Sequence, residues 1–496
     1  MLHCCVFLCG ATLMIIELTG SRILAPFLGT SLIVWTSLIG VILASLSIGS
    51  WWGGILADRT PQARKLGHIV LLAAWATAAI GLSKTWILEL LQGTGGLHTV
   101  AIASTVFLFA PASMLLGMVA PFAVRLHLKN HNVAGQTAGN LYAVSTIGSI
   151  AGTFAAGFVL IAWIRSTAIL FVSAAILAFA AWLADPSEKA IKGVSALLFC
   201  LAIVFCLKQD SWLAARGFID QDTPYNRVLV YTSKEEGTDR MTREMVTGPQ
   251  GRQSSMYLDN ATELALPYTR FYRLAEFYKP AMGRMLVLGG GGYSFPKYAL
   301  ANYPDVQIDV VELDPGITAL ARSHFALPEH PRLTVIEEDA RTFLRQVRTK
   351  YDVILCDVFN SNYSIPFHMT TVEAVALMRA ALNPGGLVLV NLLASPEGIS
   401  SRFYKAFYAT FQTAFPEVHA FAVINATGQQ QWQNIILSAL TQPPPQTAPA
   451  DDEIKAMLTQ LLPPPKDKLP PLTDEFAPVD RYLNDPLFHP SDASTP

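Results

Sequence analysis

The chain has 496 residues, of which 52% are hydrophobic and only 15% are charged. Soluble proteins carry about 25% charged residues, so this composition excludes a single soluble globular domain. The formal net charge of −2 also argues against a general nucleic-acid binder, which needs a basic surface. Residues 1–208 are nearly free of charge over long runs, whereas residues 209–496 have ordinary composition. The sequence therefore indicates a membrane half followed by a soluble half.

Seven apolar segments in the first half are long enough to cross a bilayer, which takes roughly 17–25 residues. They lie at about 1–20, 33–57, 67–83, 99–124, 141–164, 166–184 and 191–207. Small residues such as Gly49 and Gly53 are frequent, and small residues allow membrane helices to approach closely. We predict a transmembrane helical domain over residues 1–208 with about seven spans.

The basic loops of this half lie near residues 59–65, 125–129 and 189–192. The positive-inside rule makes these loops cytoplasmic. Seven spans would then put the C-terminal half outside the cytoplasm, whereas a nucleotide-like cofactor favours the inside. We expect an integral protein of the inner or plasma membrane with a cytoplasmic catalytic domain. Glu17 and Arg22 end the first apolar segment, where they either attract a cation or form an ion pair.

Residues 209–282 predict a small β unit and a connecting helix. Residues 222–232 and 255–262 have strand character, and the polar stretch 233–254 between them is expected to be a hairpin loop. Residues 268–279 form an aromatic-rich helix. Tyr225, Tyr268 and Tyr272 are candidates for a pocket, although single aromatic residues more often belong to a core or its rim.

Residues 283–440 have the pattern of a nucleotide-binding fold. An apolar strand at 285–288 runs into four glycines, Gly289–Gly292, then a helix at 294–302, a strand at 308–311 and Glu312. Glycines let a ligand approach the backbone, and the helix N-terminus favours an anion. Further strands at 333–336, 351–356 and 387–391 alternate with helices. This alternation predicts an α/β, Rossmann-like, mostly parallel sheet.

Three acids, Glu312, Asp339 and Asp357, follow the carboxyl ends of strands, where ligands of such sheets bind. We expect Glu312 to hold ribose hydroxyls, and Asp339 and the backbone of Ala340 to meet adenine. Asp357 would face the reacting centre, where a carboxylate attracts an ammonium group, accepts its proton or stabilises a sulfonium. A single acid there is often a helix cap, but three on one rim favour a site. No metal-ligand spacing occurs, so we expect no metal.

Several motifs resemble the spermidine synthase (polyamine aminopropyltransferase) family, which has the S-adenosylmethionine-dependent methyltransferase fold. They are PYNRVLVY, MYLDNATEL, LVLGGGG, VVELDP, EEDAR, YDVILCDVF, PFHMTT, LNPGG and the C-terminal LTDEFAPV. The apolar half, with ELTGSRILAPFLG and SIGSWWGGILADR, is similar to the membrane portion of fused spermidine synthase-like proteins. The expected fold is thus a multi-pass helical domain, a small β unit and a methyltransferase-like domain.

The resemblance implies transfer of an aminopropyl group from decarboxylated S-adenosylmethionine to a polyamine or related amine, with methylthioadenosine as product. It makes Asp357 the catalytic residue. The implied cofactor-binding residues are Gly289, Gly290, Gly291, Glu312, Asp339 and Ala340, and the implied substrate-binding residues are Tyr225, Glu263, Tyr268 and Asn360. The implied partners are a small amine and membrane lipid, without nucleic acid, and a homodimer is an open expectation.

The chain departs from the family pattern at four positions. Gly292 stands where the glycine loop normally carries an aspartate, and Asn360 replaces the second acid of the catalytic element. Glu263 and Asn226 stand where the family usually has glutamine. Adenosyl binding is therefore expected to be intact, whereas the acids that hold the aminopropyl chain and the amine are fewer.

Two other functions stay open. The absence of an acid at Gly292 fits a methyltransferase that uses S-adenosylmethionine itself. The membrane half and Asn360 fit a transporter or sensor that binds a polyamine or nucleoside without turnover. A nicotinamide enzyme is disfavoured because the glycine loop fits its fingerprint poorly. Residues 441–496 predict a proline-rich tether that lets the segment 472–479 pack back on the domain.

Overall fold

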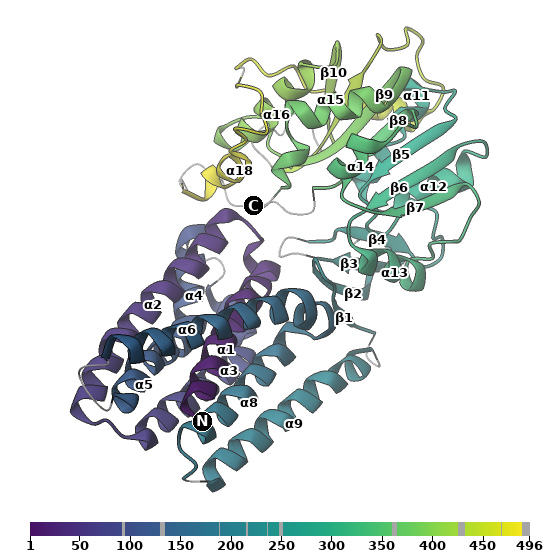
Figure 1. Ribbon diagram of the computed structural model, residues 1–496. Coiled ribbons are helices and arrows are strands. Elements are labelled where there is room, and N and C mark those ends of the chain that lie inside the picture. The colour runs from purple at the N-terminus through teal and green to yellow at the C-terminus, as the bar shows by residue number, and fades with distance from the viewer. Residues whose placement is uncertain are drawn as a thin grey trace. The chain divides into compact units, whose positions relative to one another are not determined.

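The computed structural model describes residues 1–91, 95–128, 134–187, 189–214, 217–235, 237–247, 251–359, 365–424, 432–467 and 469–488. The chain forms two compact units, shown in Figure 1. Unit 1 comprises Met1–Arg216 and Asp220–Arg227, and unit 2 comprises Gly217–Ile219 and Val228–Pro496. The finer division into four parts, inferred from composition, stays a prediction.

Unit 1 is helical. Its elements are α1 (Leu2–Leu28), α2 (Leu32–Arg59), α3 (Ala63–Leu91), α4 (Leu97–Gly117), α5 (Val119–His127), α6 (Ala134–Phe154), η2 (Ala155–Leu160), α7 (Ile161–Trp163), α8 (Ser166–Ala184) and α9 (Lys189–Ala214). Among the described residues, six helical segments are long and apolar enough to cross a membrane: Leu2–Leu28, Leu32–Arg59, Ala63–Leu91, Leu97–His127, Ala134–Leu160 and Ser166–Ala184. They coincide with the first six predicted segments. The seventh falls in α9, whose apolar stretch Lys192–Val204 is shorter than a span.

Glycines set the closest helix contacts of unit 1. A Cβ built on Gly49 of α2 would lie 2.0 Å from the carbonyl oxygen of Met114 in α4. A Cβ on Gly148 of α6 would lie 2.2 Å from the carbonyl oxygen of Phe7 in α1. Both distances are shorter than any real Cβ contact, so only glycine permits these two helix pairs to pack as they do.

A four-stranded sheet with the order β1-β2-β3-β4 precedes the larger fold. Its strands are β1 (Ile219–Asp222), β2 (Arg227–Lys234), β3 (Met241–Val246) and β4 (Ser254–Tyr257). The prediction of a loop over 233–254 was wrong, because β3 pairs with both β2 and β4 in antiparallel register. The polar residues of β3 explain why the sequence does not predict this strand. Glu244 is fully buried, and the hydroxyls of Thr242 and Ser255 donate to its Oε1 at 2.5 and 3.1 Å.

The larger sheet of unit 2 has seven strands in the order β10-β11-β9-β8-β5-β6-β7. They are β5 (Arg284–Leu288), β6 (Gln307–Glu312), β7 (Leu333–Glu337), β8 (Tyr351–Cys356), β9 (Leu382–Ala394), β10 (Glu417–Ala422) and β11 (Gln433–Leu440). β5 to β9 are parallel, whereas β11 is antiparallel to both β9 and β10. This mixed order is that of the Rossmann-like S-adenosylmethionine-methyltransferase fold, as the sequence predicted.

Helices cover both faces of this sheet (Figure 1). They are α10 (Pro267–Phe271), α11 (Leu274–Tyr278), α12 (Ser294–Asn302), α13 (Pro315–His324), α14 (Ala340–Gln346), α15 (Val372–Ala381), α16 (Arg402–Gln412), α17 (Asp452–Thr459) and α18 (Val479–Phe488), with short turns at Phe367–Met369 and Ile399–Ser401. β5 supplies Leu286 and Leu288 to the core under α14–α16, and Met285 and Val287 to the core under α11 and α12. This alternation is why the strand reads as a continuous apolar run.

The C-terminal segment packs on unit 2, as the sequence predicted. The N–H of Val372 donates to the carbonyl of Leu472 at 2.8 Å. Asp474 accepts hydrogen bonds from Thr371 Oγ1 at 2.6 Å and from the Arg341 guanidinium at 2.7 Å. Arg341 is buried, so its charge needs this carboxylate.

Candidate active site

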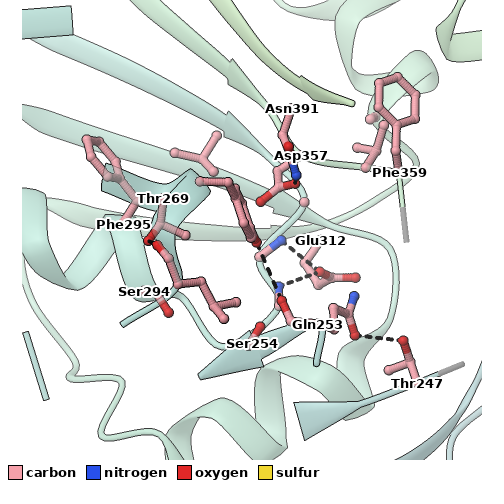
Figure 2. A pocket seen from close by; sticks show the side chains of 18 of the residues that line it. Thr247, Gln253, Ser254, Thr269, Ser294, Phe295, Glu312, Asp357, Phe359 and Asn391 are labelled. Atoms are coloured by element: carbon pink, nitrogen blue, oxygen red, sulfur yellow. Dashed lines mark hydrogen bonds between the residues drawn. The ribbon is translucent and has the colours of Figure 1, made fainter. Parts of the chain in front are cut away.

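A cavity of about 340 Å³ lies at the carboxyl ends of the parallel strands (Figure 2). Segments that follow four neighbouring strands line it: the glycine loop after β5, Glu312 after β6, Glu338–Ala340 after β7 and Asp357–Phe359 after β8. Tyr268 and Tyr272 from the α10 region also line it, as do Ser254, the first residue of β4, and Gln253, which precedes it. Its position is the one expected for a ligand of an open parallel sheet.

The glycine loop is tight because backbone from β8 lies against it. Gly289 has φ of 92°, and a Cβ there would lie 2.4 Å from the Asp357 carbonyl oxygen. Gly291 has φ of 51°, and a Cβ on it would lie 2.8 Å from Ser254 Oγ. Both positions need a residue without a side chain, which is the sequence-predicted reason for the glycine run.

Glu312 is anchored to this loop. Its Oε2 accepts hydrogen bonds from the N–H groups of Gly290 at 2.8 Å and Gly291 at 3.3 Å, and its Oε1 accepts from the N–H of Asp314 at 2.9 Å. Burial raises the pKa of Glu312, and the three backbone N–H groups oppose that rise. The carboxylate is thus held rigidly at the cavity wall.

Asp339 begins α14, as its N-cap. Its Oδ1 accepts from the N–H of Thr342 at 2.9 Å and from the Thr342 hydroxyl at 3.1 Å. The Nε2 of His368 lies 3.4 Å from Oδ2. Burial alone would raise the pKa of Asp339, but the Thr342 hydrogen bonds and His368 together hold it below its usual value. Asp339 is therefore ionised near neutral pH, and buried Ala340 lies beside it.

Asp357 follows β8 at the cavity, and its Oδ1 accepts a hydrogen bond from Asn391 Nδ2 at 3.0 Å. Asn391 Oδ1 in turn accepts from Asn434 Nδ2 at 2.9 Å, which fixes the orientation of the Asn391 amide. Burial raises the pKa of Asp357, and Asn391, Tyr268 and Tyr272 oppose that rise. Among the described residues no basic side chain forms an ion pair with Asp357, so its charge is available to a ligand.

Two tyrosines complete the surroundings of Asp357. Burial, and then the charge of Asp357, raise the pKa values of Tyr268 and Tyr272 well above the ordinary value. Both hydroxyls therefore keep their protons at neutral pH and are donors. The Tyr272 hydroxyl is buried beside Asp357, but within the described part of the chain it makes no hydrogen bond of ordinary geometry. A buried donor that is not fully bonded favours a ligand group at this point.

The position of the missing acid, Gly292, is occupied by a neighbour. Gly292 donates its N–H to Ser254 Oγ at 2.8 Å, and a Cβ on it would lie 2.8 Å from Ser254 Cβ. No larger residue fits at 292 while Ser254 stands there. Arg252 lines the same cavity and is the one residue of the 251–254 stretch that brings a positive charge.

The predicted site residues do not all reach this cavity. Gly289–Gly291, Glu312, Asp339, Ala340, Asp357 and Tyr268 line it. Glu263 does not, because both its carboxylate oxygens are bound by Arg240 at 2.7 and 2.9 Å. Tyr225 belongs to unit 1, where its side chain is 52% exposed. Asn360 lies outside the described residues.

Sequence reasoning missed Asn391, Asn434, Gln253, Ser254 and His368. Asn391 lies near the carboxyl end of β9, so the strand-end rule that selected Asp357 also applies to it. Asn434 escapes that rule because β11 is antiparallel, and its amino end meets the rim. No comparable signal marks Gln253 or Ser254.

Comparisons with known proteins find relatives of this part of the chain. Residues 272–439 match the spermine/spermidine synthase domain. This region of the chain is thus similar to the spermidine synthase family. A polyamine aminopropyltransferase of Vibrio vulnificus is 30% identical over 200 residues, which are 40% of this chain and 63% of the relative. A polyamine aminopropyltransferase of Corynebacterium efficiens is 23% identical over 420 residues, which are 78% of this chain and 76% of the relative.

The second alignment is longer than unit 2, so the relationship to spermidine synthase relatives extends into the apolar half. Alignment to the Vibrio relative spans less than two thirds of that protein's length. A solved structure of a probable spermidine synthase from Corynebacterium glutamicum is 24% identical, with a TM-score of 0.40, and the match covers 47% of this chain and 83% of that one.

Proposed function

We propose that the protein is a membrane-embedded aminopropyltransferase. It would transfer the aminopropyl group of decarboxylated S-adenosylmethionine to a polyamine or related amine. The observation that carries this proposal is one cavity that gathers Glu312, Asp339 and Asp357 on one rim of the sheet, where Asp357 has no cationic partner among the described residues. The matched spermine/spermidine synthase domain and the names of the aligned relatives support it.

The adenosyl part of the co-substrate fits the wall between β5 and β7. Glu312 would accept hydrogen bonds from the ribose hydroxyls with the lone pairs that the glycine loop does not use. Asp339 would accept from the adenine amino group, and the backbone of Ala340 would contact the ring. The cavity volume and the acids that line this wall support a bound ligand at this place.

Asp357 would act on the acceptor amine. Its carboxylate binds the ammonium form and takes the proton that nitrogen must lose before its lone pair can attack. Attack forms a C–N bond at the methylene next to the sulfonium. The C–S bond breaks, and its electron pair stays on sulfur, giving methylthioadenosine. A raised pKa brings Asp357 closer to the pKa of the amine, which makes this proton transfer less uphill.

The neighbours of Asp357 would orient its carboxylate and the acceptor, and would not exchange protons with them. Asn391 and Asn434 fix one carboxylate oxygen, so the other oxygen faces the acceptor. Tyr268 and Tyr272 stay protonated and can donate to the acceptor or to the carboxylate. Most of the acceleration would then come from orientation and electrostatics.

A methyltransferase that uses S-adenosylmethionine itself is the second candidate. Two observations favour it: Gly292 lacks the acid that would bind the aminopropyl ammonium, and Arg252 brings a cation that can pair with the donor's carboxylate. A non-catalytic transporter or sensor for polyamines or nucleosides is the remaining alternative.

We further propose that unit 1 lies in the inner or plasma membrane and that unit 2 is cytoplasmic, where nucleotide-derived co-substrates are found. The six long apolar helices support the membrane assignment. Reporter fusions after Phe488 and within residues 92–94 test the orientation. A C-terminal fusion that is active only outside the cytoplasm would contradict it.

The test of the reaction uses detergent-purified full-length protein with either donor and a panel of amines. We expect methylthioadenosine to form from decarboxylated S-adenosylmethionine only when an amine is present. Release of adenosylhomocysteine from S-adenosylmethionine would establish the second candidate instead. Binding of a donor without either product, for every amine offered, would leave the non-catalytic reading.

A further inference from the structure

Unit 1 contains a second cavity, of about 160 Å³, that the proposed reaction does not use. Its wall comes from α1, α3, the start of α8, α9 and the 220–227 stretch, all within unit 1. Six charged side chains line it: Arg22, Lys84, Arg165, Arg227, Asp220 and Asp222. Four bases against two acids give this cavity a net charge of +2.

Both acids of the cavity are already bonded. Asp220 accepts two hydrogen bonds from the Arg227 guanidinium, at 2.8 and 2.7 Å. Asp222 Oδ2 accepts from the backbone N–H of Ser166 at 2.9 Å and from its hydroxyl at 3.1 Å, which caps the start of α8. Both carboxylates therefore already have hydrogen-bond donors from the protein.

Lys84 has hydrogen-bonding capacity left. Its ammonium has three donors, and within the described part of the chain it donates to Thr167 Oγ1 at 2.5 Å. The Arg22 guanidinium donates to the carbonyls of Thr223 and Pro224, which holds its planar fork at the cavity. A partly buried cation cluster with excess charge is costly unless an anion neutralises it.

The place of the cluster fits a membrane surface. α3 has 29 residues, about 44 Å of helix, whereas the hydrocarbon core of a bilayer is about 30 Å thick. Lys84 lies seven residues before the end of α3, roughly 10 Å along the axis. In a bilayer centred on α3, the backbone of Lys84 lies about 11 Å from the midplane, roughly 4 Å inside the hydrocarbon edge, and a lysine side chain is long enough to reach the headgroups from there. Basic pockets between transmembrane helices at this depth favour phosphate-bearing headgroups.

We propose that this cavity, which we call the basic cavity, binds a phosphate group through Lys84 and the surrounding guanidinium groups. Guanidinium forks match phosphate oxygens, and Lys84 adds a point charge. The phosphate is either that of a phospholipid headgroup or free inorganic phosphate, since both present the same oxygens. An amine ligand is disfavoured because the net charge of the cavity is positive and both acids are bonded.

The test compares Lys84→Met with Lys65→Met in the full-length purified protein. Lys65 is a matched control, because it lies in the same helix and also donates to a threonine hydroxyl, that of Thr60, at 2.7 Å. One arm titrates inorganic phosphate by calorimetry in detergent. The other titrates dioleoyl phosphatidylglycerol, with dioleoylglycerol as the phosphate-free comparison, by native mass spectrometry of delipidated protein.

We expect Lys84→Met to weaken binding at least tenfold, and Lys65→Met to change it less than twofold. Binding of the phospholipid alone identifies a headgroup, and binding of inorganic phosphate identifies free phosphate. Lys84→Arg should retain most of the affinity. The proposal is overturned if wild-type protein binds neither probe, if the phosphate-free lipid binds equally well, or if both methionine variants bind like wild type. Far-ultraviolet circular dichroism confirms that each variant is folded.

Discussion

The cavity of unit 2 and the basic cavity of unit 1 have opposite charge balances, and their carboxylates differ in what binds them. In the basic cavity of unit 1, Asp220 is paired with Arg227 and Asp222 caps a helix. In the cavity of unit 2, Asp357 is held by the neutral amide of Asn391 and flanked by tyrosines. The charge of Asp220 is paired with that of Arg227, whereas the charge of Asp357 is not paired with a cation among the described residues. The partner of an acid, more than its presence, therefore decides its role.

The largest effect is expected for Asp357→Asn. We expect methylthioadenosine formation to fall about 10²–10⁴-fold, the usual range for a general base. Because burial raises the pKa of Asp357, its ionised form destabilises the fold above that pKa. The variant should therefore unfold at the same or a higher temperature than wild type at pH 7. Asp305→Asn, at an exposed position, is the control, and activity within threefold of wild type in Asp357→Asn would refute the assignment.

The pH dependence of kcat/KM tests whether Asp357 acts as a base with a raised pKa. A base works only when deprotonated, so kcat/KM should fall as pH decreases through the pKa of Asp357. Since burial raises that pKa, the acidic limb should lie above about 3.9, the ordinary value for aspartate. The rate should fall about tenfold per pH unit below the midpoint. A midpoint at or below the ordinary value, in a protein shown to be folded there, would exclude the raised pKa.

Glu312→Gln tests an acid whose partners are backbone N–H groups. We expect the Kd for the donor to rise roughly 10- to 100-fold, because hydrogen bonds to a charged group contribute about 1.5–3 kcal/mol. The rate at saturating donor should change less than the affinity. Calorimetric titration of the donor measures this, with Glu337→Gln, exposed at the end of β7, as the control. Equal donor affinity in both variants would remove Glu312 from the binding site.

The smallest effect is expected for Glu263→Gln. Arg240 binds Glu263 and Asp259 together, and this pairing lowers the pKa of Glu263. An acid engaged in this way should not select the acceptor, so kcat/KM for amines should change less than twofold. The unfolding midpoint should fall slightly, since exposed ion pairs contribute about 0–1 kcal/mol. A large loss of amine affinity would show instead that Glu263 leaves Arg240 for the substrate.

Only some residues of the active site could be predicted from the sequence, and the reason is structural. Glu312, Asp339 and Asp357 were found because every parallel strand of such a sheet delivers its carboxyl end to one rim. Asn434 was missed because β11 runs the other way. Glu263 is predicted at the substrate because its pairing with Arg240 could not be foreseen. Arg240 lies between β2 and β3, and the sequence predicts a loop where β3 is found. Glu244 is polar but buried in β3, so the strand lacks the alternation of apolar and polar residues that would predict it. The burial of such a residue depends on tertiary hydrogen bonds, which a local sequence pattern does not show.

Ser254 has a consequence for how this site can change. Its Cβ occupies the space beside Gly292, so an aspartate at position 292 would collide with β4 unless residue 254 became glycine. The two positions are coupled, and either single step on the way to the acidic loop is costly: one creates a clash, and the other leaves the Gly292 N–H without its acceptor. A variant with an acidic glycine loop therefore needs both residues substituted together.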